Sequence, residues 1–227
     1  MAAPISIILP TLDAAKGIGP CIAALVPGVV DGLVRELILS DGGSRDGIEQ
    51  VAEAAGARLV LGPPGRGGQL RRGAEAAQGD WLLFLHSDTV LSADWVPAVR
   101  RHLKEAPQEA GWFRLTFDAR GPAAAWTAGW ANWRSRLLGL PYGDQGLLVR
   151  RDVYRRAGGF PDQPLMEDVA LVRRLRTREL AATARTSADR YRRDGWLRRG
   201  WRNLSTLGLW YAGASPDRLA RRYYARR

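Results

Sequence analysis

An imidazole and a carboxylate interrupt an apolar run at residues 81 to 91, WLLFLHSDTVL. The run is typical of a buried strand, and it stops at His86, Ser87 and Asp88. In an extended strand, residues i and i+2 point to the same side, so His86 and Asp88 could face one ligand. A metal ion, a sugar hydroxyl or the water at a strand end would each fit this pair.

Two further turns carry side chains suited to binding. LILSDGGSRDG places Asp41 beside two glycines, where a carboxylate and bare backbone could receive a flat ring, although a plain Asp-Gly turn fits equally. GPPGRGGQLRRGAEAAQGD places Arg66 in a glycine-rich loop before a helix, where phosphate oxygens could bind. This loop has neither the Gly-Lys-Ser/Thr of a Walker loop nor the G-x-G-x-x-G of a dinucleotide site.

Four polar residues follow further along the chain, among turn-forming glycines and prolines: Asp144, Gln145, Glu167 and Asp168. The acidic pair stands where a helix is expected to begin, and carboxylates there complement the helix dipole. The alternative is a general base, a carboxylate that deprotonates a hydroxyl group.

Length and composition favour one folded α/β domain. The chain has 227 residues, of which 46% are hydrophobic, enough for a sizeable core. The single cysteine, Cys21, excludes an intrachain disulfide framework and a four-thiolate metal site. The N-terminal residues lack the pattern of a signal peptide, and no window of about 18 residues is uncharged and apolar. A soluble, cytoplasmic protein is therefore the expectation.

Arginine dominates the charge. The chain has 34 Lys plus Arg against 23 Asp plus Glu, giving +11, and the arginines cluster from Arg173 onward among Trp and Tyr residues. A phosphate-bearing ligand, an anionic membrane surface or nucleic acid could explain this pattern. A genome rich in G and C explains it equally, with most of the arginines solvated or packing along their stems.

Strand-like and helix-like segments alternate through the first half. We expect strands at 4–9, 35–40, 57–61 and 81–86, and helices at 15–26, 46–55, 68–78 and 94–105. The strands are continuous apolar runs, which indicates a mostly parallel sheet covered on both faces. Ligands bind such sheets at the carboxyl ends of the strands, where Thr11, Asp41 and His86 lie.

The second half predicts strands at 111–119 and 146–151 and helices at 123–140 and 166–180. The first of these helices carries Trp126, Trp130 and Trp133 at helical spacing. That spacing favours a core or a dimer face over sugar stacking, so a homodimer through this helix is one expectation.

These motifs together resemble family 2 glycosyltransferases of the GT-A fold. Their order is the family's order: Pro10 and Thr11 after the first strand, then SDGGSRDG, HSDT, GDQG, and GGFP followed by MED. The resemblance covers essentially the whole chain. GRGGQLRRGA, LFLHSDT, LPYGDQG and PLMEDVAL are most similar to a bacterial subgroup labelled arsenosugar-biosynthesis glycosyltransferases.

The resemblance implies an α/β fold of the GT-A type: a Rossmann-like, mostly parallel central sheet with flanking helices and a C-terminal helical extension. One domain would span 1–227. Its nucleotide-binding half would cover 1–90, its acceptor half 91–185, and a basic-aromatic helical tail 186–227.

The implied activity is inverting transfer of a sugar from a nucleotide diphosphate, typically a UDP-sugar, to an acceptor hydroxyl. Asp168 matches the catalytic base, and Asp88 the ligand of Mg²⁺ or Mn²⁺. Donor-binding positions are Pro10, Thr11, Asp13, Asp41, Arg66, His86, Ser87 and Asp88. Acceptor-side positions are Asp144, Gln145 and Glu167, and the tail offers Arg190, Arg192 and Arg193 near the diphosphate.

Three departures from the family pattern leave the donor base and the need for metal open. Asp13 and Ala14 replace the frequent Asn-Glu, Gly42 replaces the second acid of the base-binding turn, and His86 replaces the first acid of Asp-x-Asp. A neutral His86 could hydrogen-bond a ribose or supply nitrogen to Mn²⁺, but it suits Mg²⁺ poorly.

Two other functions remain as alternatives. A sugar-1-phosphate nucleotidyltransferase has a related layout, but LPTLDAAKG is a poor match to its glycine-rich N-terminal loop. The second is a nucleic-acid-binding or membrane-surface-binding protein that uses the basic-aromatic tail. Nucleic acid is the weaker of those two partners, whereas peripheral contact at the inner membrane face is compatible with catalysis on a small-molecule or lipid acceptor.

Overall fold

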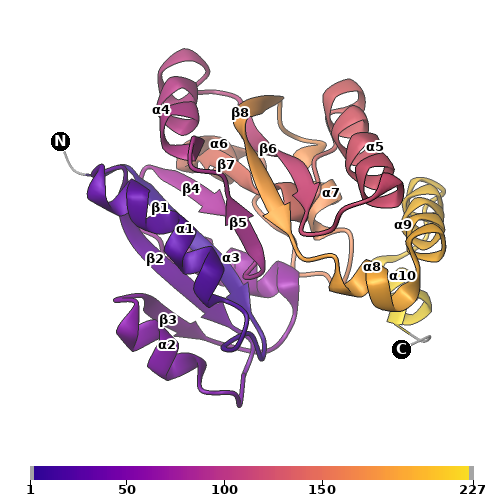
Figure 1. The fold of residues 1–227 in the computed structure, drawn as a ribbon, viewed down its shortest axis with the longest axis horizontal. Coiled ribbons are helices and arrows are strands. Elements are labelled where there is room, and N and C mark those ends of the chain that lie inside the picture. Colours follow the sequence, from indigo (N-terminus) through magenta and orange to yellow (C-terminus); the bar gives the residue numbers. More distant parts are fainter. Residues whose placement is uncertain (1–2, 225–227) are drawn as a thin grey trace.

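Eight strands form one sheet in the computed structural model, which describes residues 3–224 (Figure 1). The strand order is β3-β2-β1-β4-β7-β6-β8-β5. In chain order the strands are β1 Ile5–Thr11, β2 Val34–Asp41, β3 Arg58–Leu61, β4 Trp81–Phe84, β5 Thr89–Leu91, β6 Ala110–Phe117, β7 Leu147–Arg150 and β8 Thr177–Thr186.

The first four neighbours in this order are parallel, with Ile8 of β1 opposite both Ile38 of β2 and Phe84 of β4. Their carboxyl ends therefore meet at one edge, where the polar turns of the sequence gather. β7 enters antiparallel beside β4, and β6 and β8 then pair in parallel. The fold is the expected α/β GT-A arrangement of a mostly parallel, curled sheet with flanking helices.

Helices cover both faces of the sheet. They are α1 Gly19–Val30, α2 Ile48–Ala54, α3 Arg66–Ala76, α4 Trp95–Glu105, α5 Pro122–Leu138, α6 Arg151–Arg156, α7 Glu167–Val172, α8 Asp189–Asp194, α9 Trp196–Tyr211 and α10 Pro216–Tyr224, with a 3-10 turn η1 at Gly143–Gln145. α1, α2 and α4 bury one core against the sheet, and α3, α6 and α7 bury a second. Successive residues of β1 point into different cores, as Ile7 and Ile8 do.

The last three helices form the expected C-terminal extension and lie beside α5 (Figure 1). A third small core joins β6, α5 and the start of α8, with Phe117 packed edge-on against Tyr191 and Trp196. Residues 225–227 of the predicted tail lie outside the described part. None of the helices described here is both long and apolar enough to cross a membrane.

The predicted strands of the first half are present, but the helix expected at 15–26 runs instead from Gly19 to Val30. The helix predicted over 166–180 is correct only in its first part. α7 ends at Val172, and 177–186 forms β8. Leu180, Ala182 and Ala184 are buried at alternate positions of that strand. Its Arg, Glu, Leu and Ala residues favour a helix by themselves, and pairing with β6 and β5 overrides that preference.

Three shorter features also differ from the sequence expectation. β5 and α6 were not predicted, because three to six residues carry too little periodicity to detect. The strand predicted at 81–86 ends at Phe84, so His86 and Asp88 stand in a turn closed by the Thr89 amide bonding the His86 carbonyl at 3.1 Å. Their proximity therefore comes from a turn rather than from an extended strand.

Candidate active site

Arg66 joins three of the predicted site residues. It is the first residue of α3 and lies at the carboxyl edge of the sheet. Its Nε donates to Glu167, its Nη2 donates to Asp168 Oδ2 at 3.2 Å, and its Nη1 lies 3.0 Å from His86 Nε2. Burial alone would lower the pKa of Arg66, but the charges of Glu167 and Asp168 outweigh it and raise the pKa.

His86 is the neutral partner in this cluster. Burial, together with the charges of Arg66 and Arg190, holds the pKa of His86 well below its ordinary value. An arginine only donates hydrogen bonds, so Nε2 must accept from Arg66 and Nδ1 carries the proton. That Nδ1 lies 3.9 Å from Asp88 Oδ1, too far for a direct hydrogen bond.

This geometry revises the predicted metal role of His86. Its Nε2 lone pair is used by Arg66, and its Nδ1 is protonated, so neither nitrogen can ligate a cation in this state. Among residues 3–224, no three His, Cys, Asp or Glu side chains form a group able to hold a metal ion.

Asp88 keeps a more open position. Its side chain is 44% exposed at the end of the turn, and Ser87 beside it is partly buried. Partial burial of the carboxylate raises the pKa of Asp88 above its ordinary value, although the positive charge of Arg190 opposes this shift. Arg190 is thus the tail arginine that faces the site. Arg192 pairs instead with Asp189 and Asp118, and Arg193 with Asp194.

Asp168 sits in the first turn of α7, where three donors hold its carboxylate. Oδ2 accepts from Arg66 and from the Gly143 amide at 3.0 Å, and Oδ1 accepts from the Val169 amide at 2.8 Å. Gly143 can approach this closely because it lacks a side chain: a Cβ there would lie 2.8 Å from His86 Nε2. A carboxylate oxygen has two lone pairs, so one lone pair of Oδ1 remains for another proton donor.

The side chains of Glu167 and Gln145, predicted on the acceptor side, are both buried, and their acceptor-binding role stays a prediction. Glu167 is 1% exposed and is the buried ion-pair partner of Arg66. Burial raises the pKa of Glu167 despite that neighbouring cation. Gln145 is fully buried, and its Oε1 accepts from Ser135 at 2.7 Å and from the Tyr142 amide at 3.2 Å.

Asp144 lies close to the site, on the same turn as Gly143. Its Oδ1 is buried without a hydrogen-bond partner in the described part of the chain. Burial raises the pKa of Asp144, opposed by the charge of Arg134, which stacks 3.4 Å above the Tyr142 ring. An acceptor-side role for Asp144 stays a prediction.

The two loops predicted to hold the nucleotide are tied together at the ends of β1 and β2. Asp41 Oδ1 accepts from the hydroxyls of Thr11 and Ser44, and Oδ2 accepts from the amides of Gly43 and Ser44. Burial would raise the pKa of Asp41, but these bonds outweigh it and lower the pKa. All four lone pairs are occupied, so contact with a nucleobase would require one bond to break.

Asp13 adds two hydrogen bonds between the loop after β1 and the loop after β2. Its amide donates to the Ser44 hydroxyl at 2.8 Å, and its carboxylate accepts from the Arg45 amide at 3.0 Å. Pro10 precedes the buried Thr11 on β1. The donor-side positions thus form two groups, one around Asp41 and one around Arg66, both at the carboxyl edge of the sheet.

Sequence reasoning missed Gln69, which connects these two groups. From α3 its Nε2 donates to the carbonyls of Thr11 at 2.7 Å and Ser40 at 2.9 Å. It belongs to the GRGGQLRRGA motif, but nothing in a glycine-rich loop distinguishes a buried glutamine from a solvated one. The predicted Arg66 and the missed Gln69 therefore share one helical turn.

A small cavity lies beneath Arg66, His86 and Asp168. Its volume is about 20 Å³, and its walls are mostly apolar: Leu70, Phe84, Leu85, Leu147, Phe160 and Val172. Such a space holds about one water molecule, so a sugar would have to bind on the open side of Arg66.

The fold and the site define a protein of the GT-A class. The comparison with protein families identifies the family within that class. The family described as glycosyl transferase family 2 matches residues 6–123, slightly more than half of the chain. The chain therefore belongs to glycosyl transferase family 2.

Its curated relatives are larger proteins. A glucosyl-3-phosphoglycerate synthase from Mycolicibacterium paratuberculosis is 43% identical over 95 residues, covering 38% of this chain and 29% of the relative. A PGL/p-HBAD biosynthesis glycosyltransferase from Mycobacterium bovis is 36% identical over 120 residues, covering 46% of this chain and 44% of the relative. The matched regions thus make up less than half of these relatives.

Crystal structures of the glucosyl-3-phosphoglycerate synthase from Mycobacterium tuberculosis share the fold. The complex with Mn²⁺ and UDP-glucose has a TM-score of 0.55 at 24% identity, covering 82% of this chain and 70% of that one. The complex with Mn²⁺, UDP-glucose and phosphoglyceric acid has a TM-score of 0.50 at 28% identity, covering 66% and 57%.

Proposed function

We propose that this chain transfers a sugar, with inversion, from a nucleotide diphosphate donor to an acceptor hydroxyl. The observation that carries the proposal is the cluster at the sheet edge, in which Arg66 lies against Asp168 and Asp88 stands open nearby. Membership of glycosyl transferase family 2 supports the reaction class. The 28% identical synthase crystallised with Mn²⁺ and UDP-glucose supports a UDP-sugar as donor.

A divalent cation, Mn²⁺ or Mg²⁺, fits this site through Asp88. The described residues offer one exposed carboxylate there, and such cations commonly bind one or two carboxylates plus the phosphates of a substrate. When bound, the cation would neutralise negative charge on the diphosphate leaving group. Arg66 and Arg190 are the chain's own cations beside Asp88.

The proton of the acceptor hydroxyl would go to Asp168. Its Oδ2 is held by Arg66 and Gly143, which fixes the carboxylate, and Oδ1 retains a lone pair for the proton. The hydroxyl oxygen would attack the anomeric carbon as the bond to the diphosphate oxygen breaks. Charge then develops on that oxygen, on the side of Arg66 and Arg190.

The subgroup labelled arsenosugar-biosynthesis glycosyltransferases remains a proposal that rests on the motifs quoted above. Neither alternative function, nucleotidyl transfer or binding of nucleic acid, gains support from the relatives named here. Of the predicted acceptor-side residues, Asp144 is partly buried whereas Glu167 and Gln145 are buried, so we assign a small-molecule or lipid acceptor to the side of Asp144 and Asp168.

Thermal denaturation with a panel of nucleoside diphosphates and UDP-sugars tests the donor. Ligand that binds the folded state stabilises it by about 2.7 kcal/mol at a hundredfold excess over Kd. We expect UDP and a UDP-sugar to raise the Tm, more with Mn²⁺ than without it. No response to any nucleotide, with or without Mn²⁺, would contradict the proposal.

Asp168→Asn tests the base. Loss of a general base lowers rates by about a hundredfold or more, so we expect kcat for sugar transfer to fall at least that far while the Tm shift with UDP persists. Asp80→Asn is the matched control, because Asp80 is exposed at the opposite edge of the sheet. Transfer by Asp168→Asn at the rate of the unaltered protein would remove Asp168 from this role.

A further inference from the structure

Two helices turn apolar stripes toward solvent. On α5, the positions i, i+4, i+7 and i+11 are Trp126, Trp130, Trp133 and Leu137, all exposed. The opposite face of α5 buries Ala124, Ala128 and Ala131 against β6. On α9 the same spacing gives Leu197, Trp201, Leu204, Gly208 and Tyr211, again exposed. We call these residues, with Leu138, the α5–α9 face.

This exposure is concentrated rather than scattered. Fifteen large hydrophobic side chains are exposed among the described residues, and nine of them belong to the α5–α9 face. Trp126 is 76% exposed, Trp201 71% and Leu197 90%. Trp81, Trp95 and Trp112 are in the core, whereas the four exposed tryptophans, Trp126, Trp130, Trp133 and Trp201, all lie on α5 and α9. Clustered exposure of this kind marks an interaction surface.

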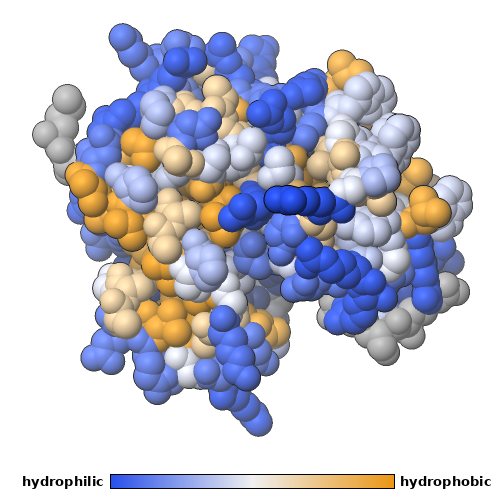
Figure 2. Space-filling view, in the orientation of Figure 1, coloured by the Kyte–Doolittle hydropathy of each residue, from blue (hydrophilic) through white to orange (hydrophobic). Residues whose placement is uncertain are grey.

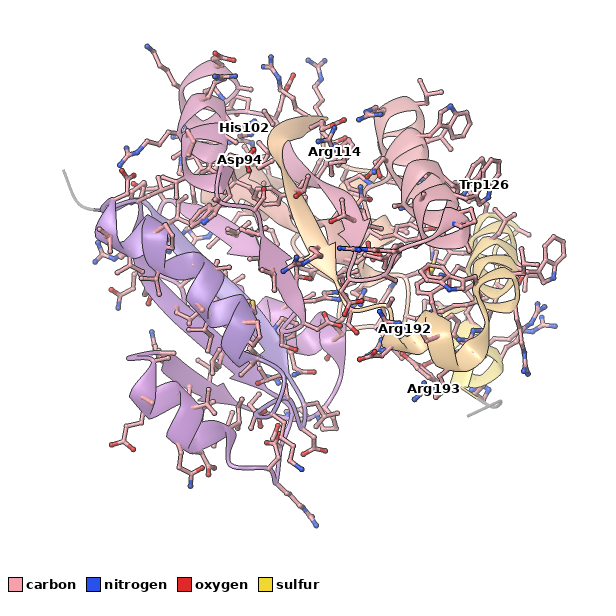
Figure 3. All side chains as sticks on the ribbon, viewed as in Figure 1. Asp94, His102, Arg114, Trp126, Arg192 and Arg193 are labelled. Atoms are coloured by element: carbon pink, nitrogen blue, oxygen red, sulfur yellow. The ribbon has the colours of Figure 1, made fainter. Side chains whose placement is uncertain are left out.

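The two stripes lie on neighbouring helices. α5 and α9 pack beside each other at one end of the molecule, far from β3 and α2 (Figure 1). Figure 2 shows mostly pale surface with isolated orange patches over this end, bordered below by blue. Trp126 points outward from α5 (Figure 3). Of the two expectations for these tryptophans, the core role is therefore wrong, and the dimer face stays a prediction.

Positive charge surrounds the α5–α9 face. α8, α9 and α10 together carry nine arginines against three aspartates, and α5 has no acidic residue. Arg198, Arg218, Arg221 and Arg222 are exposed and take part in no ion pair among the described residues. An apolar surface edged by unpaired arginines is complementary to an anionic, partly apolar partner.

This charge argues against a second copy of the chain as the partner. A twofold interface pairs a surface with itself, so it would bring the same arginines together and add like-charge repulsion. Trp and Tyr side chains instead favour the boundary between lipid headgroups and acyl chains, and basic residues beside them favour anionic lipids.

We propose that the α5–α9 face docks the protein on an anionic bilayer surface. The tryptophans and leucines enter the headgroup region, and Arg198 of α9 and the three arginines of α10 contact lipid phosphates. α5 leads into the turn that holds Gly143 and Asp144, and α8 carries Arg190, so the docked face lies next to the candidate site. Docking itself requires neither the donor nor glycosyl transfer.

Cosedimentation with vesicles tests the proposal. The full chain, in low-salt buffer without nucleotide, should bind vesicles of equimolar phosphatidylglycerol and phosphatidylcholine, and bind pure phosphatidylcholine more weakly. The double variant Trp126→Ser and Trp201→Ser should bind the anionic vesicles at least about tenfold more weakly, because binding scales with the apolar area inserted. Both side chains are exposed, so the fold should survive.

Val30→Ser and Leu61→Ser provide the matched control. These residues are 82% and 62% exposed, but they lie on α1 and β3, away from the α5–α9 face. The control should sediment with vesicles like the unaltered chain. The tryptophan variant should keep its Tm shift with UDP, which separates docking from the proposed catalysis.

Three results would overturn the proposal. One is no sedimentation with anionic vesicles even at low salt. Another is equal vesicle binding by the tryptophan variant and the unaltered chain. The third is self-association or DNA binding that depends on Trp126 and Trp201 while vesicle binding is absent, which would assign the face to a different partner.

Discussion

Arg66 holds the proposed base in place, and its guanidinium could also bind the diphosphate of the donor. It bonds Glu167, Asp168 and His86 at once, so its guanidinium fixes two side chains of α7 and one from the turn after β4. A diphosphate arriving at this edge would compete with those carboxylates for the same cation. The buried Glu167 has no other cationic partner among its described contacts, which favours retention of that bond and sharing of the outer Nη atoms.

His86 makes folding stability depend on pH. Its pKa is depressed in the folded state, whereas an unfolded imidazole titrates at about 6.5. Below that value the unfolded chain binds more protons, so stability present above pH 6.5 is lost as the pH falls toward the folded pKa. We expect the Tm of the unaltered chain to fall between about pH 7 and about pH 5, and to fall less in His86→Gln.

His86→Gln is chosen because glutamine can still accept a hydrogen bond from Arg66 without titrating. His102 also has a depressed pKa, caused mainly by burial, and it stays in both proteins. The comparison therefore isolates His86. Identical Tm changes with pH in the two proteins would show that His86 does not titrate as its surroundings predict.

At the scale of elements, a buried side-chain amide holds the turn η1 in addition to its own backbone hydrogen bonds. Gln145 connects Ser135 and Asn132 of α5 to this turn, which carries Gly143 and Asp144 into the site. Gln145→Leu would remove the bonds to Ser135 and Asn132 and leave the partly buried Tyr142 amide without its acceptor, so we expect a loss of about 2–4 kcal/mol in the free energy of unfolding by urea.

Gln108→Leu is the control for this change. Gln108 is exposed and has one side-chain bond, to Arg156, so its loss should alter the free energy of unfolding by about 0.5 kcal/mol or less. A Gln145→Leu protein as stable as Gln108→Leu would mean that the network around η1 contributes little.

The hydrophobic pattern of the sequence predicts some elements of this fold but not others. The parallel strands are continuous apolar runs, so β1, β2, β3 and β4 are visible in the sequence. β8 is concealed, because its helix-forming residues become a strand only through partners such as β6, which lies far away in the sequence. The burial of Glu167 is hidden for the same reason, because its partner Arg66 is 101 residues away in the chain. The burial of Gln145 depends on how α5, which carries Ser135, packs beside η1.

At the scale of the whole molecule, charge and exposed apolar surface share one end. The net charge is +11, and the α5–α9 face lies among the arginines of α8, α9 and α10. Electrostatic attraction to anionic lipids is screened by salt, whereas insertion of apolar side chains is not. The two contributions can therefore be separated by ionic strength.

Arg221→Gln with Arg222→Gln tests the electrostatic contribution. Each basic residue near an anionic surface contributes about 1 kcal/mol, or about fivefold in affinity, so this double variant should bind anionic vesicles more weakly at low salt. Its binding should also change less as the ionic strength rises from about 0.01 M to about 0.15 M, over which the Debye length shortens from about 30 Å to about 8 Å. The tryptophan variant should lose affinity with its salt dependence unchanged. Equal salt dependence in the arginine variant and the unaltered chain would mean that α10 does not face the bilayer, which would contradict the proposed contact between its arginines and lipid phosphates.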